Sequence, residues 1–240
     1  MRYEQLRKTY EDRWKGLNQG IPVNSKYKRL REVIPSWDLG EATLLLGQSG
    51  SGKTRFIFKV LVLDSLKFMS KNPKKKVRIL FNSLELSELD FYSMLVCYLF
   101  KEKLGIVMSS EYLLNKLQKE ELDVQLFENL EKIKPQIEFF NSWVTIKDDI
   151  RTADAWFKYC KKILDDAGYV DEQGKYQKKD PNLHFIILVD TLNALSIPSG
   201  SNKLVEMTKY SSEYMKQTLR GFYKCHCVQL QQMSKDPQSS

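Results

Sequence analysis

The sequence lacks the long hydrophobic runs and the glycine- or proline-rich tracts that mark several protein classes. Among its 240 residues, no apolar run approaches the roughly 20 needed to cross a bilayer, and the longest, around Val60–Leu63, is soon interrupted. Residues 1–15 are charged throughout and contain no apolar core of a secretory signal. With 11 Gly and 7 Pro, the composition excludes collagen and low-complexity chains. We therefore expect a cytoplasmic protein with no membrane partner.

Cysteine is sparse as well. The chain has four, Cys97, Cys160, Cys225 and Cys227, too few to staple a secreted scaffold and without a C-x-x-C pair. The triplet around His226 could suggest a metal site, but alternate side chains of a strand point to opposite faces. His226 should therefore point away from both neighbouring thiols, and we expect reduced cysteines instead of structural zinc.

The excess of positive charge is moderate. Lys and Arg number 38 against 30 Asp and Glu, which gives a formal net charge of +8. This charge permits a nucleic-acid partner without demonstrating one. The sharpest basic run, Lys74–Lys76, follows Asn72-Pro73 and is interpreted as a solvated turn before a strand.

From Trp37 onward, strand-like and helical patterns alternate along the chain. Apolar strand candidates occupy 42–46, 77–81, 137–140, 183–189 and 225–230. Helical patterns occupy 54–69, 89–104, 111–133, 152–167 and 205–222, and 168–182 is a polar loop or hairpin. Pro135 is expected to mark the end of the third helix. Near-continuous apolar strands separated by helices predict an α/β fold, a mostly parallel sheet with helices on both faces.

The first 35 residues have a different pattern. Tyr3, Leu6, Tyr10 and Trp14 recur at spacings of three and four, which predicts an amphipathic helix over residues 2–18. We therefore divide the chain into an N-terminal helical arm and linker, residues 1–35, and one α/β domain, residues 36–240. The arm should pack against the main domain or a neighbouring subunit.

One motif carries specific chemistry. The pattern G-x-x-x-x-G-K-[ST] is matched by Gly47, Gln48, Ser49, Gly50, Ser51, Gly52, Lys53 and Thr54. The glycines let backbone N–H groups wrap around a polyphosphate, and the following helix adds its positive N-terminus. Lys53 should reach the β- and γ-phosphates, and the Thr54 hydroxyl should bind Mg²⁺. The motif lies between an apolar strand and a long helix, so the sequence predicts binding of ATP and Mg²⁺.

Further polar residues follow the strand candidates. Asp190 ends the run 183–189 and is predicted to hold Mg²⁺ through water. Glu85 follows the second strand, and since ligands of open parallel sheets bind at the carboxyl ends of strands, it is placed to act as general base. Glu88 and Asp90 are alternatives, better suited to the first turn of the next helix. A glutamine after the last strand, Gln231 or Gln232, could contact the γ-phosphate.

Together these features resemble the RecA-type ATPase domain of DnaB-like replicative helicases, over roughly residues 20–234. The segments that carry the resemblance are Gly20–Pro22 with Leu30 and Ile34-Pro35, the Walker A motif Gly47–Thr54, Ser83–Ser87, Asp190–Asn193, and the helix with Met215, Lys216 and Leu219. Ser83–Ser87 is similar to the family's S-L-E-M-S stretch, whose glutamate is the catalytic base. The family's glutamine sensor falls best on Gln231, which we group with Glu85 and Lys53 as catalytic candidates.

The resemblance implies a RecA-like P-loop ATPase that assembles as a hexameric ring and translocates on single-stranded DNA, in a bacterial or phage-infected cell. In such rings an arm of one subunit docks on the next, a role suited to residues 2–18. The loop 196–203 would face the channel, with Lys203 and Lys235 as DNA contacts. The family's arginine finger follows the sensor, and Arg2, Arg78, Arg151 and Arg220 are not in that position. We therefore expect a domain incomplete at its C-terminal end that hydrolyses ATP slowly alone, or alternatively an ATP-gated loading or recombinase-type module without strand separation.

Overall fold

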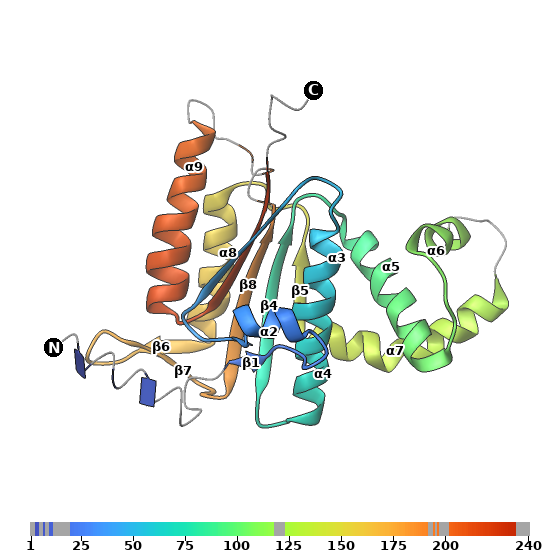
Figure 1. Ribbon diagram of the computed structural model, residues 1–240, viewed down its shortest axis with the longest axis horizontal. Helices are drawn as coiled ribbons and strands as arrows, with labels where there is room; N and C mark the ends of the chain where they lie inside the picture. The colour runs from blue at the N-terminus through green and yellow to red at the C-terminus, as the bar shows by residue number, and fades with distance from the viewer. Residues whose placement is uncertain are drawn as a thin grey trace.

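Five parallel strands form the central sheet of the protein (Figure 1). The computed structural model describes residues 3, 4, 7, 10, 11, 20–117, 123–191, 194, 196 and 202–233. The strands are β3 (Ala42–Gly47), β4 (Lys76–Ser83), β5 (Val144–Lys147), β8 (Leu183–Asp190) and β9 (His226–Gln232), in the spatial order β3-β9-β8-β4-β5. All pairings within this sheet are parallel, so the carboxyl ends of the strands share one edge, at the top of Figure 1.

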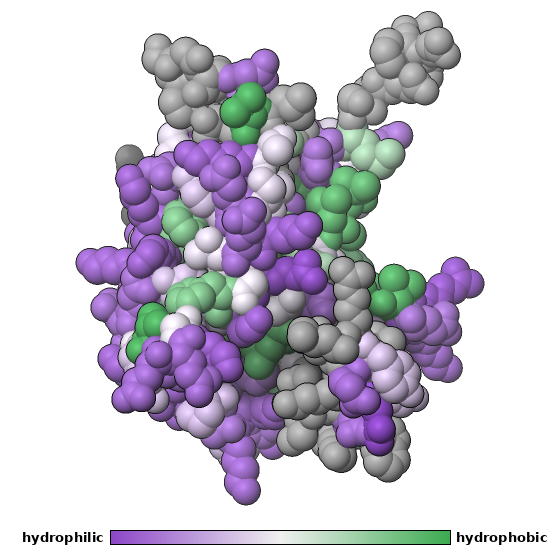
Figure 2. All heavy atoms as spheres, turned by 90° about the vertical axis from the view of Figure 1, so that its left-hand side faces the viewer, coloured by the Kyte–Doolittle hydropathy of each residue, from purple (hydrophilic) through white to green (hydrophobic). Residues whose placement is uncertain are grey.

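Helices cover both faces of this sheet. One face carries a continuous helix formed by α3 (Lys53–Ile57), η1 (Phe58–Leu63) and α4 (Asp64–Lys71), together with α5 (Glu88–Leu99), η2 (Phe100–Leu104), α6 (Ser110–Leu117) and α7 (Val124–Trp143). The other face carries α8 (Ala153–Asp166), α9 (Lys203–Lys209) and η4 (Tyr210–Phe222). The outer side of this second layer is mainly hydrophilic (Figure 2). The α/β fold expected from the sequence is therefore confirmed.

Strand β8 shows how the sheet divides the interior into two cores. Ile186 and Leu188 are buried with the helices around α3, whereas Phe185, Ile187 and Val189 are buried with α8 and η4. This alternation follows from the two-residue period of a strand, because successive side chains point to opposite faces. Each such burial stabilises the fold by about 1.5–3 kcal/mol, so the centre of the sheet is a rigid base for its functional edge.

The N-terminal segment from Gly20 packs on the same core. Strand β1 (Ile21–Pro22) pairs antiparallel with β2 (Ser36–Trp37), and α2 (Lys28–Val33) lies between them in the chain. Ile21, Val23 and Trp37 are almost fully buried. Residues 20–35 thus share the core of the main domain, while most of the helix expected over residues 2–18 lies outside the described residues. The boundary at residue 35 stays a prediction.

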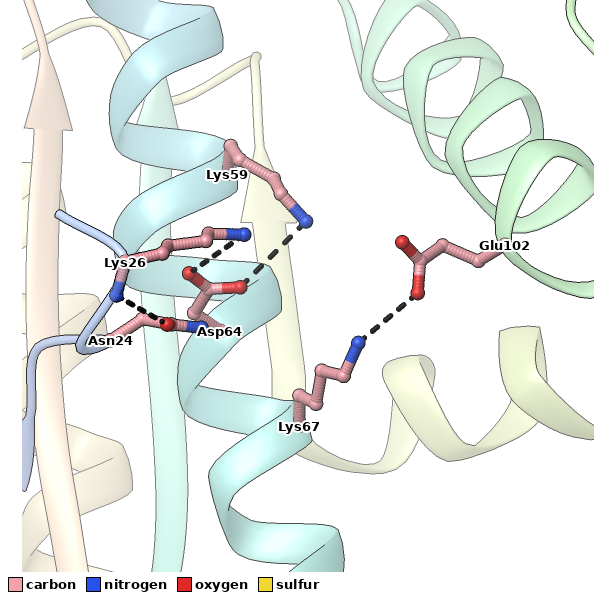
Figure 3. Close-up of polar contacts among 6 residues, drawn as sticks. All are labelled: Asn24, Lys26, Lys59, Asp64, Lys67 and Glu102. Carbon is pink, nitrogen blue, oxygen red and sulfur yellow. Dashed lines mark hydrogen bonds and ion pairs between the residues drawn. The ribbon is translucent and has the colours of Figure 1, made fainter.

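Ion pairs attach this segment and η2 to the helix that follows the P-loop (Figure 3). The carboxylate of Asp64, at the start of α4, lies 3.9 Å from the ammonium of Lys26 and 3.7 Å from that of Lys59. One turn further, Lys67 pairs with Glu102 of η2 at 3.1 Å. Burial lowers the pKa of Lys59 although Asp64 opposes the shift. The helix is therefore anchored on two sides beyond its first turns.

One predicted strand and one predicted helix end are wrong. Residues 137–140 belong to α7, which contains Pro135 in its interior, and the strand begins only at Val144. A proline within a helix removes one hydrogen bond and costs about 3 kcal/mol. The helix continues because Ile133 and Phe140, on either side of the proline, are buried in the same core.

The cysteine-rich strand has the arrangement that its alternation predicts. The Nδ1 atom of His226 lies 2.8 Å from the carbonyl of Asp38, and its ring contacts Trp37. Cys225 and Cys227 are buried in the opposite core as free thiols. Over the part of the chain that is described, no cluster of three or more His, Cys, Asp or Glu is arranged for a metal ion. Nor does any helix there have the length and apolar character needed to span a membrane.

Candidate active site

The P-loop follows β3 directly and ends in the first turn of α3. Gly50 and Gly52 have φ values of 73° and 79°, in the left-handed region that glycine adopts without a steric penalty. A Cβ atom at Gly47 would lie 2.9 Å from the Ser51 hydroxyl and 3.2 Å from Lys53 Cδ. The backbone conformation therefore favours glycine at positions 50 and 52, and a side chain at Gly47 would require Ser51 and Lys53 to shift. The residues between Gly47 and Lys53, namely Gln48, Ser49, Gly50, Ser51 and Gly52, are exposed.

Lys53 places a positive charge inside this loop. Its ammonium donates hydrogen bonds to the carbonyls of Gly47 at 3.0 Å and Gln48 at 2.8 Å. The side chain is largely buried, with 9% of the residue exposed. The helix that begins at Lys53 continues without a break to Lys71, so its N-terminal partial charge adds to that of the ammonium.

Thr54 and Asp190 are brought together across the sheet. The Thr54 hydroxyl donates a hydrogen bond to Asp190 Oδ2. Asp190 ends β8 and is fully buried, and its other oxygen, Oδ1, has no hydrogen-bond partner among the described residues. Hydroxyl and carboxylate oxygens are the ligands that Mg²⁺ prefers, so this pair fits the predicted metal site.

The environment of Asp190 disfavours its charge. The pKa of Asp190 is raised to about 6, mainly by burial and in smaller part by nearby Glu85, while the hydrogen bond from Thr54 and the charge of Lys53 act in the opposite direction. A divalent cation at this position would reverse that balance, because it favours the ionised carboxylate.

Glu85 lies on the short segment between β4 and α5. The preceding residue, Leu84, donates its N–H to the carbonyl of Asp190 at 2.5 Å, which continues the strand pairing by one residue. The Ser83 hydroxyl accepts a hydrogen bond from the N–H of Leu86 at 3.2 Å. Glu85 itself is exposed, on a segment that is fixed on both sides.

The alternative carboxylates serve the next helix. Ser87 and Asp90 form a capping box, in which each side chain accepts the backbone N–H of the other residue at 3.2 and 2.9 Å. The N–H of Glu88 donates to Asp148 Oδ2 at 2.8 Å, so Asp148, the residue after β5, also caps the first turn of α5. The interpretation of Asp90 as a helix-capping residue is confirmed.

Gln232, one residue beyond the predicted sensor, lies next to Glu85. Its Nε2 atom donates a hydrogen bond to Glu85 Oε1. The register pairs Gln231 with Leu46 and Gln232 with Gly47 of the P-loop. Val228 and Leu230 are buried on the α3 face, and the alternation of β9 places Gln232 on that face and Gln231 on the other. This phase is the signal in the sequence that could have selected Gln232.

The remaining candidates are the proposed DNA-contacting lysines and the four arginines, and each lies on a different segment. Lys203 begins α9, and its side chain, like residues 197–201 and Lys235, lies outside the described part of the structure. Three of the arginines donate to main-chain carbonyls of their own chain: Arg78 to Ser142, Arg151 to Leu84 and Arg220 to Gly40. Arg2 is not among the described residues. No pattern in the sequence indicates the contact of Arg151 with the segment of Glu85.

Known structures share this fold. A structure described as that of a DnaB-like replicative helicase and its interactions with primase has a TM-score of 0.64 at 15% identity, covering 97% of this chain and 48% of that chain. The ATPase domain of G40P has a TM-score of 0.58 at 16% identity, covering 97% of this chain and 71% of that chain. The chain thus spans about half the length of the first. Neither a family model nor a curated protein matches the sequence. At these identities the likeness establishes the fold alone, and the expected α/β fold with a parallel sheet and helices on both faces is one that these structures share.

Proposed function

We propose that the chain is a helicase-type P-loop ATPase domain, which binds Mg²⁺-ATP and moves on single-stranded DNA. The observation that carries the proposal is the convergence of four elements at one edge of the sheet: the P-loop after β3, Glu85 after β4, Asp190 at the end of β8 and Gln232 at the end of β9. In an open parallel sheet this edge is the usual place for a ligand.

In this proposal each residue has a separate task. Backbone N–H groups of Gly47–Thr54 and the ammonium of Lys53 bind the phosphates. Thr54 and Asp190 hold Mg²⁺, which neutralises charge on the phosphate oxygens when bound. The Glu85 carboxylate accepts the proton of the attacking water, and the amide of Gln232 orients that carboxylate.

DNA binding and ring assembly are inferred more indirectly. The formal charge of +8 suits a polyanionic partner, and the DnaB-like fold suits a hexameric ring of identical subunits. Lys203 and Lys235 remain the proposed DNA contacts, because they lie on the segments that leave the carboxyl ends of β8 and β9.

The test combines hydrolysis, binding and unwinding in one preparation. The wild-type chain should hydrolyse ATP only with Mg²⁺ and faster with single-stranded DNA, and DNA affinity with a non-hydrolysable ATP analogue should fall steeply with salt. Lys53→Ala should lose nucleotide binding. Lys67→Ala is the matched control, because Lys67 lies on the same helix but pairs with Glu102 away from the loop.

Each result separates the proposal from its alternative. Equal nucleotide affinity of the Lys53→Ala and Lys67→Ala variants would refute the P-loop assignment. DNA-stimulated hydrolysis without unwinding of a forked duplex would favour the ATP-gated loading or recombinase-type module. Salt-independent DNA binding, or none, would exclude a motor that tracks the DNA backbone.

A further inference from the structure

Arg151 holds the residue that precedes Glu85. Its guanidinium Nη1 donates a hydrogen bond to the carbonyl of Leu84 at 3.0 Å. The N–H of Leu84 donates to the carbonyl of Asp190 at 2.5 Å. Leu84 is thereby held at its N–H by the end of β8 and at its carbonyl by Arg151. The Leu84 carbonyl belongs to the peptide group that joins Leu84 to Glu85. The guanidinium therefore restrains the direction in which the Glu85 side chain extends from the backbone.

The main chain of Arg151 makes a second connection. Its carbonyl accepts a hydrogen bond from the N–H of Ser196 at 2.7 Å. Ser196 belongs to the segment between Asp190 and α9, which includes the proposed DNA-contacting loop. One residue therefore contacts the Glu85 segment through its side chain and the segment after Asp190 through its backbone.

Arg151 is itself placed between fixed points. On one side, the side-chain amide of Asn82, buried near the end of β4, donates to the carbonyl of Ile150 at 3.0 Å. On the other side, Thr152 caps α8 by accepting the N–H of Ala155 at 3.3 Å. The backbone at Arg151 is thus held by the sheet on one side and by a helix on the other. A displacement of Ser196 would therefore pull on a residue whose backbone neighbours are fixed.

We propose that Arg151 is a positioning residue. It holds the Glu85 carboxylate in the direction from which it can accept the proton of the attacking water, and it connects the Glu85 segment to the segment of Ser196. The proposal rests on the ATPase function proposed above. The planar guanidinium suits this role, because it binds an acceptor in a defined direction. A misplacement of about 1 Å at a reacting group can cost about 10²-fold in rate, so a contact one peptide away from Glu85 has a measurable effect.

The first experiment compares Arg151→Ala and Arg151→Lys with Arg78→Ala. Arg78 is the matched control because it also donates to a main-chain carbonyl, that of Ser142 at 2.5 Å, but from the first half of β4. We expect Arg151→Ala to lower kcat by roughly 10- to 100-fold with KM for ATP within about twofold. Arg151→Lys keeps one donor and should recover part of kcat, and Arg78→Ala should leave kcat within about twofold.

The second experiment separates the backbone contact from the side chain. Ser196→Pro removes the N–H that donates to the Arg151 carbonyl, whereas Ser196→Ala retains it. Proline should reduce the stimulation of hydrolysis by single-stranded DNA to near one, and alanine should keep the stimulation. Full stimulation of the proline variant would overturn the connection.

Hydrogen exchange tests the positioning role without relying on turnover. The N–H groups of Leu84, Leu86 and Ser87 are all hydrogen-bonded, so Arg151→Ala should accelerate their exchange and Arg78→Ala should not. A wild-type chain that does not hydrolyse ATP would refute the proposed function, while this exchange would still report on the contact. Wild-type kcat in Arg151→Ala, or unchanged exchange at these amides, would overturn the positioning role itself.

Discussion

The side-chain amide of Gln232 donates a hydrogen bond to the carboxylate of Glu85, although 147 positions separate them in the sequence. The contact joins the end of β9, the strand beside the P-loop strand, to the segment after β4. A group that touches the proposed general base and lies in register with Gly47 is well placed to respond to the state of the nucleotide.

This contact distinguishes two neighbouring glutamines. Gln232→Ala should lower kcat by roughly 10- to 100-fold, because the carboxylate loses the donor that orients it. Gln231→Ala should remain within about twofold, since its side chain points to the opposite face of β9. Steady-state ATPase assays on both variants make the comparison, and a loss confined to Gln231→Ala would restore the assignment made from the sequence.

Glu85→Gln separates binding from chemistry. The amide retains the size of the side chain but cannot accept the proton, so kcat should fall by about 10²–10⁴-fold while nucleotide affinity stays close to that of the wild type. Fluorescent-nucleotide titration and single-turnover hydrolysis measure the two effects. Glu88→Gln is the control, because Glu88 lies in the first turn of α5, and wild-type turnover in Glu85→Gln would exclude this residue as base.

Asp190→Asn should change the pH dependence of stability in the absence of nucleotide. Burial raises the pKa of Asp190 to about 6 from an ordinary value of 3.8, so the folded state binds this proton more tightly than the unfolded state does. The wild type therefore loses stability as pH rises from about 4 through 6. Relative to the wild type, the asparagine variant should gain up to about 3 kcal/mol in unfolding free energy over that interval.

Denaturant unfolding from pH 2 to pH 8 measures this gain, with Asp171→Asn as a control of opposite sign whose effect appears below about pH 4. Hydrogen bonds from Gln177 and from backbone N–H groups lower the pKa of Asp171, so its contribution appears as pH rises and is lost as pH falls. A pH-independent difference between wild type and Asp190→Asn would show that the carboxyl is not perturbed. In the wild type, Mg²⁺-dependent ATP binding should also weaken below about pH 6, because Mg²⁺ binds the ionised carboxylate.

The capping box of α5 predicts a stability effect without a catalytic one. Ser87→Ala removes the acceptor for the Asp90 N–H and should cost about 1 kcal/mol, seen as a lower denaturation midpoint with an unchanged slope. Ser70→Ala is the control, because its hydroxyl donates to the Lys67 carbonyl near the exposed end of α4. Equal midpoints for the two variants would contradict the assigned cap.

The sequence predicts those features whose cause is local. The strand Leu183–Asp190 is a continuous apolar run, and the P-loop needs glycines at fixed spacings, so both are recognised without knowledge of the fold. Pro135 was misleading for the opposite reason. Its local preference ends a helix, but the stripe of Ile133, Ile137 and Phe140 continues on one face, and burial of that stripe outweighs the lost hydrogen bond.

The site was predictable only as far as its residues follow strands. Glu85 and Asp190 could be placed together because the carboxyl ends of parallel strands meet. The choice between Gln231 and Gln232 depends on the phase of β9, which the apolar alternation of the strand carries in the sequence but which identifies a face of the sheet only once the two cores are known. The contact of Arg151 with Leu84 spans 67 positions and follows no spacing rule, so it becomes visible only in three dimensions.

The pairing of β3 with β9 has a consequence for how the protein is made. Within the described sheet, the strand that carries the P-loop lies at one end, and its neighbour is the last strand, so Ala42 pairs with Cys227. During synthesis from the N-terminus, the chain presents Gly47–Thr54 long before the strand that supports it has left the ribosome. Nucleotide binding should therefore arise late and all at once, and a nascent chain ending before His226 should leave β3 unpaired.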